Sequence, residues 1–288
     1  MNVINTNISA LKASNASSQA GKALGTAMER LSTGKRINSA KDDAAGLAIA
    51  TSMTSQVRGM NQGIRNANDG ISLAQTAEGA LNEVTNMLQR QRELTVQASN
   101  GTYSAADKAN LKAEMDALNT QIKSVLDNTE FNGEKLFAGG KDADGAIDTE
   151  VENKVTIQAG ANAADTVEIN LGVGLSAADA FAEEEGTFGV DVTADDFSNA
   201  EIAKFDTAIK LVSTTRANLG ASQNQLESAV NNLSSNITNL SDARSRIEDT
   251  DYSAETTALA KSQILSQASS AMLAQANQSQ QNVLSLLR

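Results

Sequence analysis

The chain has 288 residues, a formal net charge of −12, and no Pro, Cys, Trp or His. Without Cys and His it lacks disulfides, thiolate or imidazole metal ligands and the common hydrolytic triads. The negative charge argues against a nucleic-acid binder, and no apolar run is long enough to span a membrane as a helix. A carboxylate-only enzyme remains open, but the missing residue types argue against any enzyme. We therefore expect a non-enzymatic protein that uses no cofactor and binds no metal.

The first residues predict a helix that is poor in both charged and apolar side chains. Residues 1–28 carry only two charged side chains, both Lys, and Ile4, Ile8 and Leu11 recur at helical spacing. A helix this weakly amphipathic is not stable on its own in water. It also lacks the basic segment and short apolar core of a secretory signal peptide. We therefore expect either a cytosolic protein or one exported by another route.

A loop and two helices are predicted next. Residues 34–46 (GKRINSAKDDAAG) interrupt the first helix with turn-forming and charged residues. The helical pattern over about 44–99 predicts a long rod, because a helix rises 1.5 Å per residue. A second helix is predicted over about 104–128, before an Asn-Gly turn at 132–133. Its apolar residues step by 4, 3, 4 and 3, which predicts a coiled-coil-like seam: Leu111, Met115, Leu118, Ile122 and Val125.

The middle of the chain is acidic and predicts strands. Residues 141–201 hold 15 Asp or Glu and only two Lys. Apolar and polar residues alternate over 151–159 and 167–171, which predicts an antiparallel hairpin. Residues 172–200 predict an irregular exposed segment with at most one short helix. The acidic run 183–185 suits cations, but no calcium-loop pattern is present, and a solvated surface is the simpler interpretation.

A heptad pattern marks the helix predicted from about residue 199. Apolar residues recur every seven positions, which is a strong coiled-coil signal: Leu219, Leu226, Leu233, Leu240 and Ile247. An intramolecular seam against residues 64–127 is the simplest interpretation, and a dimeric coiled coil is the alternative. Residues 249–251 break this helix.

The last predicted helix, from about residue 253, resembles the first. It carries only three charged side chains, and its apolar residues are thinly spread: Leu265, Met272, Leu273 and Leu286. We predict that the two terminal helices need many copies of the chain as partners, and that they order only on assembly. The fold class predicted is mainly α, an antiparallel long-helix bundle or coiled coil with a small β-hairpin region in the middle.

Charged residues gather on the long helix predicted over 44–99. Arg90, Arg92 and Glu93 lie close together, beyond a core side made of Leu81, Val84 and Leu88. The simplest interpretation is an exposed polar face with weak local ion pairs. The alternative is a contact surface for another subunit or for a receptor.

Several long motifs resemble those of bacterial flagellin and occur in that family's order. They are MNVINTNISALKA, LSTGKRINSAKDDAAGLAIA, LQRQRELTVQASN, FNGEKLF, RANLGASQNQLE, SDARSRIEDTDYSAE and NQSQQNVLSLLR, and the resemblance covers about residues 1–171 and 199–288. It implies a secreted structural subunit that polymerises into the helical flagellar filament for swimming motility.

The resemblance also implies a division into domains. The terminal helices, 1–33 with 253–288, would form the inner tubular layer called D0, with the thinly spread apolar residues above as its polymerisation contacts. Residues 34–171 with 199–252 would form the helical rod and hairpin of D1. Residues 172–198 would be a short exposed segment in place of the outer domains D2 and D3 of larger members.

Partners and an export route are implied as well. Subunits of this family leave the cell unfolded through the flagellar type III export apparatus, without a cleaved signal peptide. The implied partners are other subunits, an export chaperone on the C-terminal helix, the filament cap and the hook–filament junction proteins. Some members are recognised by the flagellin-sensing Toll-like receptor through a D1 surface, which also packs between subunits. The matching residues here are Gln89, Arg90, Arg92, Glu93, Leu94 and Glu114.

Three alternatives remain open. The related hook–filament junction protein shares the terminal helices, although residues 31–50 favour the filament subunit. A flagellin with a metalloprotease insert would need His ligands, and the chain has no His. A monomeric coiled-coil binding module would keep its oligomeric state in sedimentation after the loss of residues 1–33 and 253–288.

Overall fold

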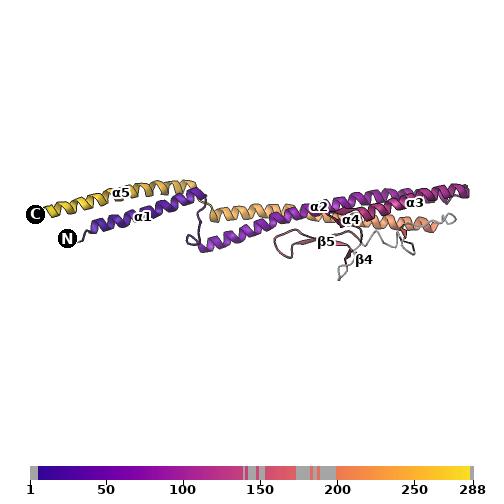
Figure 1. The fold of residues 1–288 in the computed structure, drawn as a ribbon, viewed down its shortest axis with the longest axis horizontal. Helices are drawn as coiled ribbons and strands as arrows, with labels where there is room; N and C mark the ends of the chain where they lie inside the picture. The colour runs from indigo at the N-terminus through magenta and orange to yellow at the C-terminus, as the bar shows by residue number, and fades with distance from the viewer. Residues whose placement is uncertain are drawn as a thin grey trace. The chain divides into compact units, whose positions relative to one another are not determined.

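The structure is a computed structural model that describes residues 6–138, 140–141, 147–148, 153–172, 182–183, 187–188 and 199–285. Over these residues the chain is mainly helical, and the predicted fold class is confirmed (Figure 1). The helices are α1 (Ile8–Thr33), α2 (Ala44–Ala98), α3 (Ala105–Asn128), α4 (Asn199–Glu248) and α5 (Tyr252–Ser285). The chain divides into two compact units, residues 1–57 with 238–288 and residues 58–237.

The strands form short antiparallel pairs between α3 and α4 in the sequence. They are β1 (Glu130–Phe131) with β2 (Glu134–Lys135), β3 (Gly140–Lys141) with β4 (Ile147–Asp148), β5 (Lys154–Gln158) with β6 (Thr166–Asn170), and β7 (Ala182–Glu183) with β8 (Thr187–Phe188). The β5–β6 pair is the predicted hairpin. The β7–β8 pair lies in a segment for which no strand was predicted, and most of that segment falls outside the described residues.

Local capping chemistry sets the helix ends. The side chain of Asn7 accepts a hydrogen bond from the N–H of Ala10 at 3.0 Å and caps the start of α1. Gly34 ends α1 in the left-handed conformation (φ 72°), which a residue with a Cβ rarely adopts. Ser104 and Asp107 form a reciprocal capping box at the start of α3.

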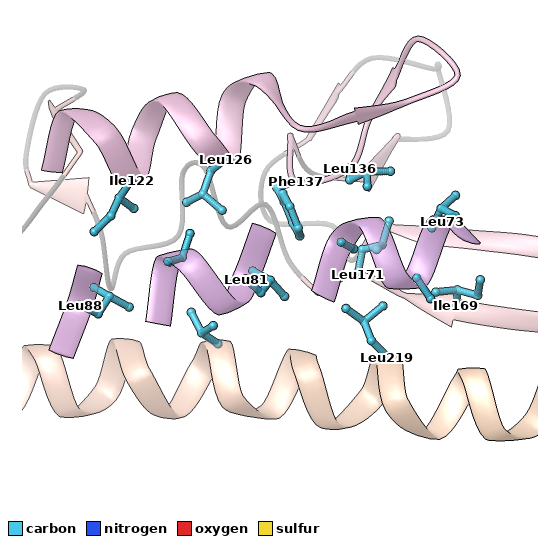
Figure 2. Close-up of a cluster of buried hydrophobic side chains, with 14 of the residues drawn as sticks. Leu73, Leu81, Leu88, Ile122, Leu126, Leu136, Phe137, Ile169, Leu171 and Leu219 are labelled. Carbon is cyan, nitrogen blue, oxygen red and sulfur yellow. The ribbon is translucent and has the colours of Figure 1, made fainter. Parts of the chain in front are cut away.

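The apolar core of the unit formed by residues 58–237 joins α2 to α3, α4 and the hairpins. Figure 2 shows α2 running between α3 and α4, with Leu81 and Leu88 facing into the shared core. Leu219 and Leu226 of α4 belong to the same buried cluster, so this part of the heptad stripe packs within the chain. Its next member, Leu233, is also buried. Other fully buried large side chains are Met115, Ile122, Leu126, Leu136, Phe137, Ile169, Leu171 and Phe205.

The β5–β6 hairpin lies against α2 at glycines, because those positions leave room for its backbone. A Cβ on Gly63 would lie 2.7 Å from the carbonyl oxygen of Ala159, and a Cβ on Gly59 would lie 2.8 Å from the Cβ of Ala161. The side-chain amide of Asn66 donates a hydrogen bond to the carbonyl oxygen of Gln158 at 3.0 Å. This bond fixes the hairpin next to Gly59 and Gly63 of α2. Close packing of helix and hairpin therefore depends on glycine.

This contact gives a matched pair of tests on one helix. Gly63→Ala is expected to destabilise the protein by about 1–3 kcal/mol, because the Ala159 backbone must move. Gly79→Ala is expected to stabilise it by about 0.5–1 kcal/mol, because no atom lies within 4 Å of the new Cβ and alanine favours a helix. Urea unfolding of both variants measures the effects. Equal shifts of the two midpoints would contradict the close contact.

Candidate functional site

The terminal helices α1 and α5 pack side by side through a seam of small residues (Figure 1). The buried residues of α1 are Ala20 and Ala27, seven positions apart. Those of α5 are Ser262, Ser269 and Ala276, again at intervals of seven. Small side chains let two helix backbones approach closely, and α1 and α5 are in extensive contact. The fully buried positions of this seam are therefore all occupied by small side chains.

Several larger apolar side chains of these helices lie outside the seam, whereas Leu24, Leu31 and Leu259 are half-buried. Ile8, Leu11, Leu265 and Met272 are each 48–64% exposed, and Leu273 is half-buried. Ile4 and Leu286, predicted as part of the same set, lie outside the residues whose side chains the structure describes. The paired helices thus present uncovered apolar side chains on surfaces that carry few charges.

Two further aliphatic residues belong to this exposed set and were not singled out from the sequence. Met28 of α1 and Ile264 of α5 are 57% and 66% exposed. Met28 directly follows the seam residue Ala27, and Ile264 lies two positions after the seam residue Ser262. Both residues lie off the stripe of positions, three or four residues apart, at which α1 and α5 are buried or half-buried.

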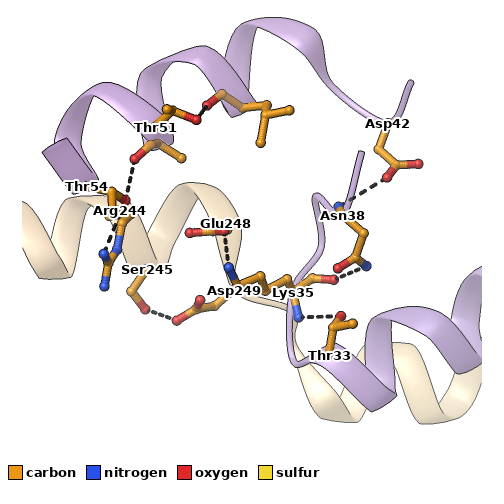
Figure 3. Close-up of polar contacts among 12 residues, drawn as sticks. Thr33, Lys35, Asn38, Asp42, Thr51, Thr54, Arg244, Ser245, Glu248 and Asp249 are labelled. Atoms are coloured by element: carbon orange, nitrogen blue, oxygen red, sulfur yellow. Dashed lines mark hydrogen bonds and ion pairs between the residues drawn. The ribbon is translucent and has the colours of Figure 1, made fainter. Parts of the chain in front are cut away.

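The loop between α1 and α2 is tied to the end of α4 by backbone and side-chain contacts (Figure 3). The N–H of Arg36 donates to the carbonyl oxygen of Glu248 at 2.6 Å, and the N–H of Thr250 donates to that of Gly34 at 3.0 Å. The Nζ of Lys35 lies 2.6 Å from a carboxylate oxygen of Glu248. The breaks before α2 and after α4 therefore form one hydrogen-bonded junction.

Asp42 fixes the shape of the same loop. Its carboxylate accepts from the N–H of Ser39 at 3.0 Å, the N–H of Asn38 at 3.2 Å and the Ser39 hydroxyl at 3.1 Å. The backbone N–H groups, first that of Ser39 and then that of Asn38, hold the pKa of Asp42 below its ordinary value. Because the folded pKa is lowered, this contribution to stability is present above the unfolded pKa. It is lost as the pH falls through the folded pKa.

The charged face of α2 is held by ion pairs to two different helices. Nε and Nη2 of Arg90 donate to one carboxylate oxygen of Glu114 in α3, at 3.0 and 2.8 Å. Its Nη1 lies 3.4 Å from Glu93. Nε of Arg92 donates to Asp206 in α4 at 2.6 Å. Hydrogen bonds to Glu114 and to Asp206, and then the charges of these carboxylates, raise the pKa of Arg90 and of Arg92 respectively.

The structure brings most of the predicted recognition residues to this face, with one exception. Gln89, Arg90, Glu93 and Glu114 are exposed, and Arg92 lies partly exposed beside them. Leu94 is only 1% exposed and packs in the bundle core, so this surface does not present its side chain. Asp206 was not predicted, because only the folded chain brings it to Arg92.

Neither a membrane span nor a metal centre is found in the part of the chain that the structure describes. None of the described helices is apolar over enough of its length to cross a bilayer. Within the same residues no three Asp or Glu side chains are grouped as metal ligands would be.

Comparison with known proteins decides the family. Residues 4–142 match the bacterial flagellin N-terminal helical region, and residues 202–287 match the bacterial flagellin C-terminal helical region. A flagellin of Bacillus subtilis (strain 168) is 46% identical in an alignment that covers 99% of each chain. The chain belongs to the bacterial flagellins.

A second curated relative agrees with this assignment. A flagellin of Halalkalibacterium halodurans is 45% identical over 91% of each chain. Among solved structures, Bacillus cereus flagellin has 28% sequence identity and a TM-score of 0.42, covering 59% of this chain and 88% of that one. Both full-length relatives are named flagellins rather than junction proteins.

This flagellin is therefore a structural, non-enzymatic subunit of the extracellular flagellar filament. Membership of the family implies that it polymerises with other flagellin subunits. The sequence prediction of a filament subunit is confirmed. The roles of individual residues stay predictions.

Proposed function

We propose that α1 and α5 are the polymerisation device of this flagellin, packing against copies of themselves as the inner tube of the filament. The observation that carries the proposal is the pair's surface. The fully buried positions of its seam are Ala and Ser, while Ile8, Leu11, Leu265 and Met272 remain uncovered. Burying one such side chain stabilises by about 1.5–3 kcal/mol. A tube that surrounds each helix pair with others therefore gains the apolar burial that the isolated pair lacks.

The chain supports a matching proposal for the domains. D0 would comprise residues 1–33 and 253–288, and D1 residues 34–171 with 199–252. The helix break at Gly34 and the break between Glu248 and Tyr252 support these boundaries. Residues 172–198 would be a short outer segment in place of D2 and D3.

We further propose that the subunit is exported unfolded by the flagellar type III apparatus and that its ends fold only on assembly. The absence of Cys suits this route, because no disulfide can lock the chain before export. The weak apolar burial of the terminal pair supports the second part. The helix pair in the structure is then the form that we assign to the assembled subunit. An export chaperone on the C-terminal helix, the filament cap and the hook–filament junction proteins would be its other partners.

Limited proteolysis tests this order of events. In purified monomer, trypsin is expected to cut at Lys12, Lys22 and Lys261 before it cuts within α2–α4, since local unfolding exposes these sites. In filaments the same sites are expected to be protected. A companion chain that lacks residues 1–33 and 253–288 should stay monomeric in sedimentation. Termini that resist trypsin equally in monomer and filament, or a truncated chain that still polymerises, would contradict the proposal.

The charged face of α2 supports a second proposed role, recognition of the monomer by the flagellin-sensing Toll-like receptor. Exposed Gln89, Arg90 and Glu93 of α2 adjoin Glu114 of α3, in the arrangement that the family resemblance implies. Ion pairs hold these side chains on the bundle, so the surface is formed before a partner arrives. The same face would pack between subunits in the filament.

A further inference from the structure

The composition of this flagellin leaves Met as its main target for oxidants. The chain has seven Met and two Tyr but no Cys, Trp or His. Peroxides oxidise sulfur most readily, and with no thiol in the chain the thioether of Met is the remaining sulfur target. Which Met residues an oxidant reaches then depends on their exposure.

The structure ranks the methionines clearly. Met272 is 64% exposed and Met28 is 57% exposed, whereas the core residue Met115 is 1% exposed. Met53, Met60 and Met87 are half-buried. The two most exposed thioethers among the described residues therefore both lie on the terminal helices α1 and α5.

Both side chains lie on the surface that we assign to assembly. Met28 follows the buried seam residue Ala27, and Met272 lies between the seam residues Ser269 and Ala276. Neither is covered by the partner helix. Flexible, polarisable Met side chains adapt well to apolar interfaces. They lose this property when a polar oxygen is added to the sulfur.

We propose that Met28 and Met272 are reversible oxidation sites, and that sulfoxide at these positions prevents the free subunit from adding to the filament. The inference rests on the proposed function of α1 and α5. In the reaction, a sulfur lone pair attacks one oxygen of hydrogen peroxide and the O–O bond breaks. The sulfur gains that oxygen and loses two electrons, while the peroxide is reduced to water.

The consequence follows from burial. A sulfoxide oxygen on a side chain that enters an apolar interface loses its water partners, and an unsatisfied polar group there is strongly unfavourable. In the assembled filament Met28 and Met272 would be buried between subunits, and the oxidant could then no longer reach them. A dithiol-dependent methionine sulfoxide reductase would restore the thioether, with the oxygen leaving as water and two thiols joining as a disulfide.

Hydrogen peroxide on purified monomer tests the site. Peptide mass spectrometry is expected to find sulfoxide at Met28 and Met272 before Met115. The critical concentration for seeded polymerisation is expected to rise about tenfold, which corresponds to about 1.4 kcal/mol. Treating the oxidised wild-type protein with methionine sulfoxide reductases A and B should restore assembly. In intact filaments the same two residues should stay unoxidised at that dose.

Variants separate this inference from the proposed function. Met28→Leu with Met272→Leu conserves volume and should assemble before and after peroxide treatment. Equal loss of assembly in this variant and in the wild type would overturn the oxidation inference, as would unchanged assembly of wild type with sulfoxide at both positions. Met272→Lys needs no oxidant. If it assembles normally, the proposed assembly surface fails; if only Met272→Lys is blocked and the sulfoxide is not, the oxidation inference alone fails.

Discussion

Leu11→Lys combined with Leu265→Lys is expected to abolish filament formation and leave the helical bundle of residues 58–237 folded. The two side chains are 57% and 48% exposed in α1 and α5, so the free subunit tolerates a charge there. In the proposed inner tube each Lys would be buried without a counter-ion, at a cost of several kcal/mol per charge. Each substitution also removes about 1.5–3 kcal/mol of apolar burial. Because every subunit carries both changes, the defect recurs at each step of growth.

Seeded sedimentation and electron microscopy measure this outcome. Wild-type seeds with variant monomer should give no pelletable growth, while circular dichroism should show an unchanged cooperative transition for the bundle. Leu11→Met combined with Leu265→Ile is the matched control, because it keeps both positions apolar at similar volume. Growth of the Lys variant at the wild-type critical concentration would place the assembly contacts elsewhere on the molecule.

Periodic segments and capping residues made most of the helical framework predictable. The predicted helix over 44–99 and the observed α2 differ by one residue, because a long periodic pattern is a local signal that needs no tertiary contact. The β5–β6 hairpin was equally visible as alternation. The β7–β8 pair was not, because strands of two residues are too short to show a period.

Leu94 shows why the candidate surface was less predictable than the fold. The core side of α2 runs through Leu81, Val84 and Leu88 and then reaches Gln91, which is buried at 1% exposure. Gln91 donates to the carbonyl oxygen of Met115 at 3.2 Å and to the side chain of Asn119, so the fold accommodates a polar residue in the seam. In the sequence this Gln interrupts the apolar stripe. From the sequence alone, the core side therefore ends before Leu94.

Long-range ion pairs were beyond sequence reasoning for another reason. Arg92 and Asp206 are 114 positions apart, and no periodic pattern links them. Their contact depends on how α4 packs along α2, which many residues decide together. The seam of α1 and α5 is a similar case. Its heptads of Ala and Ser are visible in the sequence, but their meaning emerges only when the two helices are paired.

Arg90→Glu is expected to reduce activation of the flagellin-sensing Toll-like receptor by the monomer by about 30-fold or more. Losing one partner of a hydrogen-bonded charge pair at an interface costs about 2–5 kcal/mol, and each 1.4 kcal/mol is tenfold in affinity. The measurement is the half-maximal concentration in a receptor reporter assay with purified monomer. Arg65→Glu, an exposed Arg on the same helix that hydrogen-bonds to Gln62, is the control and should keep near wild-type potency.

The charge swap Arg90→Glu with Glu114→Arg separates a receptor contact from a structural role. In the wild type Arg90 joins α2 to α3 through Glu114 at 2.8 Å, so a loss in the single variant could come from a loosened bundle. The swap restores an ion pair between the helices but inverts both charges toward the receptor. We expect wild-type thermal stability with potency still lost. Leu94→Ala cannot replace this test, because that side chain is buried and its truncation costs about 2–5 kcal/mol of stability. If the swap recovers potency, Arg90 and Glu114 only position the surface, and the receptor reads neighbouring residues such as Gln89 and Glu93.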